Sequence, residues 1–130
     1  MSETRSVTAM WGDETQTCIN WSFQGKWTGS DYFESLVQVW KLMDSKQENL
    51  NLLVDMQHSR ANPSNLVALM QAAVRKQPSC NIRRIVVVTN TSYWQSLYEI
   101  ASRHNSVIAG LDVHFVATPN EANKLLNAFD

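Results

Sequence analysis

Cysteine, net charge, glycine and proline are scarce in this sequence, and each scarcity excludes a class of protein. Two cysteines among 130 residues, with no CxxC pair, supply neither a disulfide scaffold nor a zinc motif. Eleven basic residues against twelve acidic ones create no global field, so nucleic acid is not expected as a partner. With four glycines and three prolines, the chain shows no linker or low-complexity tract.

Long apolar runs are also missing. No run approaches the roughly 18 residues that a bilayer-spanning helix needs, and the opening Met-Ser-Glu-Thr-Arg contains no apolar segment typical of a signal peptide. We therefore expect no membrane insertion, no secretion and a cytoplasmic location. In that reducing compartment Cys18 and Cys80 are expected to be thiols rather than a disulfide.

What the sequence does contain is a clear alternation of strand and helix patterns. Apolar and polar side chains alternate over residues 6–23 on both sides of Gly12-Asp13-Glu14, which predicts a β-hairpin. After Gly25, either Thr28 or Ser30 can cap a helix whose apolar spacing ends near Ser45.

The remaining elements repeat a strand-then-helix order. Apolar stretches near 50–56, 82–89 and 111–117 predict strands that run parallel to one another. Further helices are expected to open at Asn62-Pro63, at Ser92 and at Thr118-Pro119. The whole chain, 1–130, is thus expected to form one α/β domain: a mixed sheet of about five strands, with an N-terminal hairpin followed by βαβαβα and helices packed on the sheet.

This element order, in a chain of this length, resembles the STAS domain, the fold of anti-anti-sigma factors. Two local patterns support the resemblance. The stretch Phe23-Gln24-Gly25-Lys26-Trp27-Thr28 is similar to the family's strand-ending glycine pattern, and Val54-Asp55-Met56 is similar to the pattern that ends its first buried strand. The resemblance implies a bacterial regulatory module that binds a protein partner.

The same resemblance makes Ser64 a phosphoacceptor candidate. In the family the acceptor serine follows the strand-ending aspartate by nine positions, and Ser64 is the ninth residue after Asp55. A phosphate there would face free backbone N–H groups at a helix start. The chain departs from the family by having Pro63, not an aspartate, before the serine.

Polar residues cluster directly after the first buried strand. Asp55, His58, Ser59 and Arg60 are expected to form an interaction loop at the carboxyl end of the sheet, where open α/β sheets bind their ligands. No catalytic motif accompanies them, so we expect no enzyme. His104 and His114 lack histidine or acidic companions at ligand spacing, so no metal and no cofactor are expected.

Five tryptophans are many for this length. Trp21, Trp40 and Trp94 follow core-facing periodicities, whereas Trp11 and Trp27 lie at strand ends and are candidates for an exposed partner surface. The basic residues Arg83 and Arg84 form a small cluster with Arg75 and Lys76 that is expected to be solvated, and docking of an anion or an acidic partner is the alternative.

Two functions follow from these patterns. The first is a non-enzymatic regulatory module that binds a protein regulator or forms a homodimer. The alternative is a carrier domain whose tryptophan- and methionine-rich apolar faces enclose a pocket for a small molecule or lipid.

Overall fold

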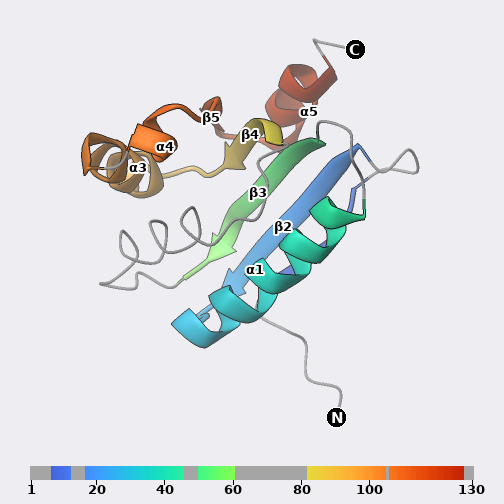
Figure 1. Cartoon of the computed structure of the whole chain (residues 1–130). Helices are drawn as coiled ribbons and strands as arrows, with labels where there is room; N and C mark the ends of the chain where they lie inside the picture. Colours follow the sequence, from blue (N-terminus) through green and yellow to red (C-terminus); the bar gives the residue numbers. More distant parts are fainter. Residues whose placement is uncertain (1–6, 13–16, 46–49, 61–81, 105, 128–130) are drawn as a thin grey trace.

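The computed structural model describes residues 7–12, 17–45, 50–60, 82–104 and 106–127. The described strands follow one another in the predicted order (Figure 1). The strands are β1 (Val7–Trp11), β2 (Cys18–Gly25), β3 (Leu50–Ser59), β4 (Ile82–Val88) and β5 (Val113–Val116). The helices are α1 (Gly29–Asp44), α3 (Tyr93–His104), α4 (Ser106–Ala109) and α5 (Pro119–Asn127).

The strands form one five-stranded sheet in the order β1-β2-β3-β4-β5. β1 pairs with β2 in antiparallel fashion, and every later pair is parallel. The predicted hairpin, the parallel strands and the mixed α/β sheet are therefore confirmed. Two details differ from expectation, since β3 continues to Ser59 and the short helix α4 follows α3. The helix predicted to open at Asn62-Pro63 lies outside the described residues.

Local chemistry explains where α1 begins. Thr28 is its N-cap: the Thr28 hydroxyl accepts a hydrogen bond from the backbone N–H of Asp31, and the Asp31 carboxylate accepts one from Thr28 N–H. This reciprocal capping box satisfies two backbone donors that have no partner inside the helix. Of the two caps that the sequence allowed, the structure uses Thr28.

The helices divide between the two faces of the sheet. Val86 and Val88 of β4 pack beneath α5, where Ala122 is fully buried. Side chains alternate along a strand, so Val87 faces the opposite side, which it shares with residues of α1 and α3. α1 lies over the β1–β2 end of this second face. Trp94 and Leu97 of α3 pack into the same hydrophobic core as Val87.

Candidate functional site

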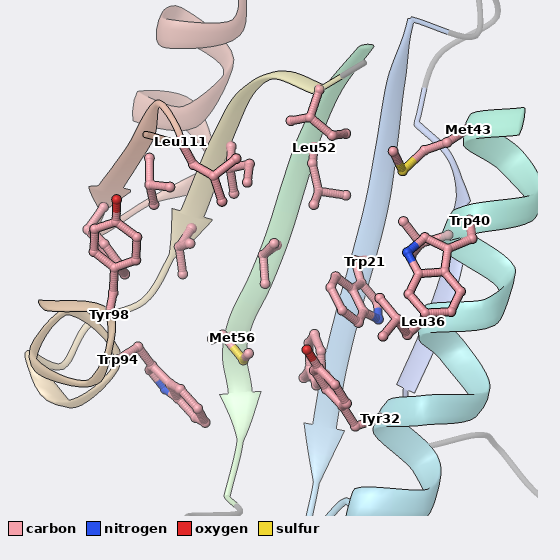
Figure 2. Close-up of a pocket in the computed structure, with 18 of the residues that line it drawn as sticks. Trp21, Tyr32, Leu36, Trp40, Met43, Leu52, Met56, Trp94, Tyr98 and Leu111 are labelled. Atoms are coloured by element: carbon pink, nitrogen blue, oxygen red, sulfur yellow. The ribbon is translucent and has the colours of Figure 1, made fainter. Parts of the chain in front are cut away.

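An apolar cleft lies on the face of the sheet that α1 and α3 share. Its volume is about 200 Å³, and all the described residues that line it are apolar or aromatic. Figure 2 shows side chains of α1, including Trp40, on one side of the strands and side chains of α3, including Trp94, on the other. The cleft thus has the sheet as its floor and the two helices as its walls.

Strand register explains why the floor is hollow. Trp21 of β2, Val54 of β3, Val87 of β4 and Phe115 of β5 are paired in one row across the sheet, and all four line the cleft. Two short valine side chains therefore lie between two aromatic side chains. The sequence places the smallest residues of the row in its centre, which leaves space above β3 and β4.

Stacked aromatic rings connect the α1 wall and the α3 wall of the cleft near the carboxyl ends of the parallel strands. The Trp27 indole is nearly parallel to the Tyr32 ring at 6.4 Å between centroids and to the Trp94 indole at 6.0 Å. Phe23 packs against Trp27 at 4.9 Å and against Trp21 at 5.0 Å. These contacts hold the start of α1 and the start of α3 against the same strands.

Two indole nitrogens beside the cleft are already hydrogen-bonded within the protein. Trp21 Nε1 donates to Ser35 Oγ at 2.8 Å, and Ser35 in turn donates to the Tyr32 carbonyl. Trp27 Nε1 donates to Ser59 Oγ at 2.8 Å. Burial raises the pKa of the Tyr32 phenol above its ordinary value, so Tyr32 is uncharged at neutral pH.

The predicted interaction loop is wrong in one respect, because its residues belong to a strand. Asp55, His58 and Ser59 lie in β3, where β2 pairs with both of the last two residues, and only Arg60 follows the strand. The backbone N–H of Arg60 still donates to the Gly25 carbonyl at 2.8 Å, which continues the ladder.

The side chains of these four residues also differ in their contacts and in their exposure. Asp55 Oδ1 accepts hydrogen bonds from the backbone and side chain of Gln57, and Ser59 Oγ accepts one from the Trp27 indole. His58 and Arg60 are exposed. The structure therefore does not gather the four residues into one site.

The prediction of an exposed tryptophan surface is wrong for Trp27 and finds no support at Trp11. Trp27 is only 3% exposed, because its ring packs among other aromatic residues and its N–H is bonded to Ser59. Trp11 is half-buried against the main core cluster. The three core-facing tryptophans behave as predicted, with Trp21 and Trp94 buried and Trp40 partly so. Ser64 lies outside the described residues.

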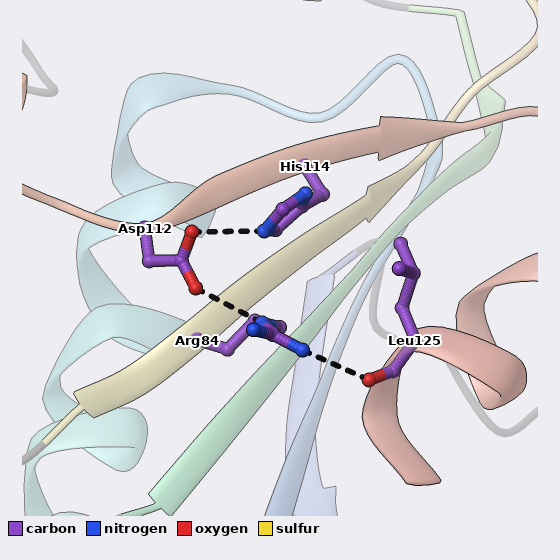
Figure 3. Close-up of polar contacts among 4 residues, drawn as sticks. All are labelled: Arg84, Asp112, His114 and Leu125. Carbon is purple, nitrogen blue, oxygen red and sulfur yellow. Dashed lines mark hydrogen bonds and ion pairs between the residues drawn. The ribbon is translucent and has the colours of Figure 1, made fainter. Parts of the chain in front are cut away.

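Arg84 belongs to a polar network at the start of β4 and β5 (Figure 3). Arg84 Nε donates to Asp112 Oδ2 at 2.9 Å, and Arg84 Nη1 donates to the Leu125 carbonyl at 3.0 Å. His114 Nε2 donates to Asp112 Oδ1 at 2.8 Å. The expectation of a solvated Arg84 is therefore wrong, and so is that of a His114 without an acidic companion, since β5 places Asp112 beside both.

Acid should weaken this network. The hydrogen bond from Arg84 holds the pKa of the Asp112 carboxyl below its ordinary value, against a partial desolvation that opposes it. A carboxyl with a lowered pKa stabilises the fold above its unfolded pKa and loses that effect as pH falls through the folded value. We expect Asp112→Asn to lower the stability at pH 7 by less than about 1 kcal/mol, since the pair is half-exposed.

The measurement is the urea midpoint of the wild type and Asp112→Asn from pH 7 down to about pH 3. The difference between the two should shrink as the pH falls. Asp44→Asn, at the exposed end of α1, controls for the loss of a surface carboxylate. A difference that stays constant over this range would contradict the assigned role of Asp112.

Two kinds of site are not found in the described part of the chain. No group of three or more His, Cys, Asp or Glu side chains there could hold a metal ion. Among the described helices, none combines the length and apolarity needed to cross a membrane. Cys18 is half-buried and forms no disulfide with a described residue, whereas Cys80 lies outside them.

The sequence patterns did not identify Tyr32 and Val87 as residues that line the cleft. Tyr32 lies on the buried side of α1, four positions before Leu36, and helical spacing could have identified it. Val87 lies within a continuous apolar run, so the sequence pattern does not show which face of the sheet its side chain is on. Only the register with Val54 and Phe115 reveals that it faces the cleft.

Comparison with known proteins identifies the fold. Neither a protein-family model nor a curated protein matches the sequence. One solved structure, an uncharacterized DUF3478-family protein from Shewanella loihica PV-4 with a SpoIIAA-like fold, superposes with a TM-score of 0.68. The match covers 97% of this chain and 98% of that one at 12% sequence identity. The chain therefore has a SpoIIAA-like fold, the STAS-type architecture that its element order resembles.

Proposed function

We propose that this chain is a non-enzymatic binding domain whose apolar cleft holds a small molecule with a long apolar body. The cleft between α1 and α3 carries this proposal. Ligand sites are concave, mostly apolar and lined by aromatic side chains, with few polar groups to orient the ligand. The cleft has each of these properties, and a chain-like apolar molecule could lie over Val54 and Val87 between the aromatic side chains of the row.

The regulatory role implied by the STAS resemblance has weaker support. It rests on the fold, and one fold serves many functions. The candidate phosphoacceptor, Ser64, lies outside the described residues, and Trp27 is too buried to contact a partner. Binding to a protein regulator remains a prediction, whereas the cleft is a specific feature that favours the carrier.

A fluorescent probe tests the carrier function directly. N-phenyl-1-naphthylamine is neutral and apolar, and its emission rises when it leaves water for an apolar site. We expect saturable one-to-one binding by the full chain, displacement by decan-1-ol, and a matching one-to-one adduct in a native mass spectrum. A bare chain with no saturable binding would refute the proposal.

That negative result is also what we expect if another segment of this chain occupies the cleft. Residues 61–81 connect β3 to β4 and lie outside the described residues. The sequence predicts a helix there with an apolar face formed by Leu66, Val67, Met70, Ala73 and Val74. If this segment fills the cleft, neither the probe nor decan-1-ol will bind to the folded protein.

A further inference from the structure

The Tyr32 hydroxyl is a buried polar group without a hydrogen-bond partner in the described part of the protein. Tyr32 is 6% exposed and lines the cleft, and its Oη makes no hydrogen bond with any described residue. In Figure 2 its side chain extends from α1 over β2, with the oxygen at the end that is farther from the helix. Its neighbours differ, since the Trp21 and Trp27 indoles both have hydrogen-bond acceptors.

An unpartnered buried hydroxyl is unfavourable. Moving a hydroxyl from water into an apolar environment without a new hydrogen bond costs free energy, so buried polar groups in folded proteins are nearly always paired. Phenylalanine would fill the same space among Trp21, Phe23 and Trp27 without that cost. A tyrosine here is explained if the occupant of the cleft supplies the missing partner.

The surroundings of Tyr32 also restrict the charge of that partner. Among the described residues, no lysine, arginine or histidine lines the cleft, so an anionic group would lose its hydration without gaining a counter-charge from them. The phenol itself stays protonated at neutral pH because burial raises its pKa. It can therefore donate a hydrogen bond to a neutral oxygen. On the opposite wall, Trp94 Nε1 is a second buried donor that has no partner among the described residues.

We propose that the ligand of this cleft carries a neutral hydrogen-bond acceptor, a hydroxyl or carbonyl oxygen, and that Tyr32 Oη donates to it. This inference rests on the proposed carrier function and adds the chemical class of the ligand and its orientation. The polar end lies beside α1, and the apolar body extends over Val54 and Val87 toward α3. Tyr32 thus selects fatty alcohols, ketones and related neutral amphiphiles over hydrocarbons and carboxylates.

Three ligands with the same ten-carbon body test the selection. Decan-1-ol and decan-2-one each have a neutral oxygen, whereas 1-chlorodecane has no comparable acceptor. We expect the wild type to bind the alcohol and the ketone about tenfold more tightly than the chloride, as measured by displacement of N-phenyl-1-naphthylamine. In Tyr32→Phe this preference should vanish while binding of the chloride is kept.

The matched control is Tyr93→Phe, which removes a phenol hydroxyl from the start of α3 without touching the cleft lining. It should keep the wild-type preference. If the wild type binds the probe but Tyr32→Phe discriminates among the three ligands as the wild type does, this inference fails and the carrier function stands. If the wild type binds no probe at all, both fail together.

Thermal unfolding of the ligand-free protein gives a second readout. Removal of an unpartnered buried hydroxyl should raise the melting temperature of Tyr32→Phe or leave it unchanged, because no hydrogen bond is lost. If residues 61–81 supply the partner instead, the substitution leaves a buried acceptor unpaired. The melting temperature of Tyr32→Phe would then fall, and the inference would be overturned.

Discussion

Phe23→Ala is expected to lower the free energy of unfolding by about 3–5 kcal/mol, the usual cost of emptying a fully buried phenylalanine site. Phe23 is 1% exposed, and its ring contacts Trp21, Trp27 and Tyr32. Trp21 belongs to β2, Trp27 follows β2, and Tyr32 lies in the first turn of α1. Because these rings also pack against one another, they cannot move into the cavity that the substitution leaves. Since domains are stable by only about 5–15 kcal/mol, this loss is a large share of the total.

Urea unfolding of wild type and variant, followed by far-UV circular dichroism, measures the loss. Phe33→Ala is the matched control, because Phe33 is half-buried and packs edge-on against Tyr32, its neighbour in α1. It should cost clearly less than Phe23→Ala. Equal losses for the two variants would mean that Phe23 is not at the centre of this aromatic cluster.

Val87→Phe should remove ligand binding without destabilising the fold. Val87 is 8% exposed and lies in the middle of the cleft floor, between Val54 and Phe115. A phenyl ring at this position would occupy the space that we assign to the apolar body of the ligand. We expect affinity for N-phenyl-1-naphthylamine to fall at least tenfold, or about 1.4 kcal/mol, while the urea midpoint changes little.

The adjacent valine on the opposite face is the control. Val86 is fully buried, packs in one cluster with Ala122 of α5, and does not line the cleft. Val86→Phe adds the same atoms to a packed core, so it should cost about 1–3 kcal/mol through strain. Its affinity for the probe should be kept under conditions where the variant is folded.

The stabilities of Val87→Phe and Val86→Phe also test whether the cleft is open. If the chain itself fills the space above β3 and β4, Val87→Phe will overpack that region and destabilise the protein as much as Val86→Phe does. An equal loss of stability would therefore contradict an open cleft, whatever the probe shows.

Much of the fold could be predicted from periodicity. Alternation over residues 6–23 predicted the hairpin, and the apolar runs predicted β3, β4 and β5 close to their observed bounds. Strand ends were less certain, because β3 continues to Ser59 through Gln57 and His58, which are not typical strand residues. Pairing with the end of β2 extends the strand there, and sequence alone does not contain that tertiary contact.

The candidate site was less predictable for a similar reason. Polar residues after a buried strand suggested a site around Asp55, yet these side chains form local contacts with Gln57 and Trp27. The cleft depends on which residues share a row across the strands, as Trp21 and Val54 do. Row partners are distant in sequence, so no local pattern reports them. The same holds for Arg84 and Asp112, which only the parallel pairing of β4 and β5 brings together.

The near-parallel stacking of Trp27 on Trp94 gives this protein an internal optical reporter. Two indoles whose centroids are 6.0 Å apart and whose planes differ by 26° couple their electronic transitions. Such coupling splits the aromatic circular dichroism bands and depends steeply on separation and angle. One ring precedes α1 and the other begins α3, so any change in the spacing of the two walls would alter the signal. The width of the cleft could thus be followed in solution without a label.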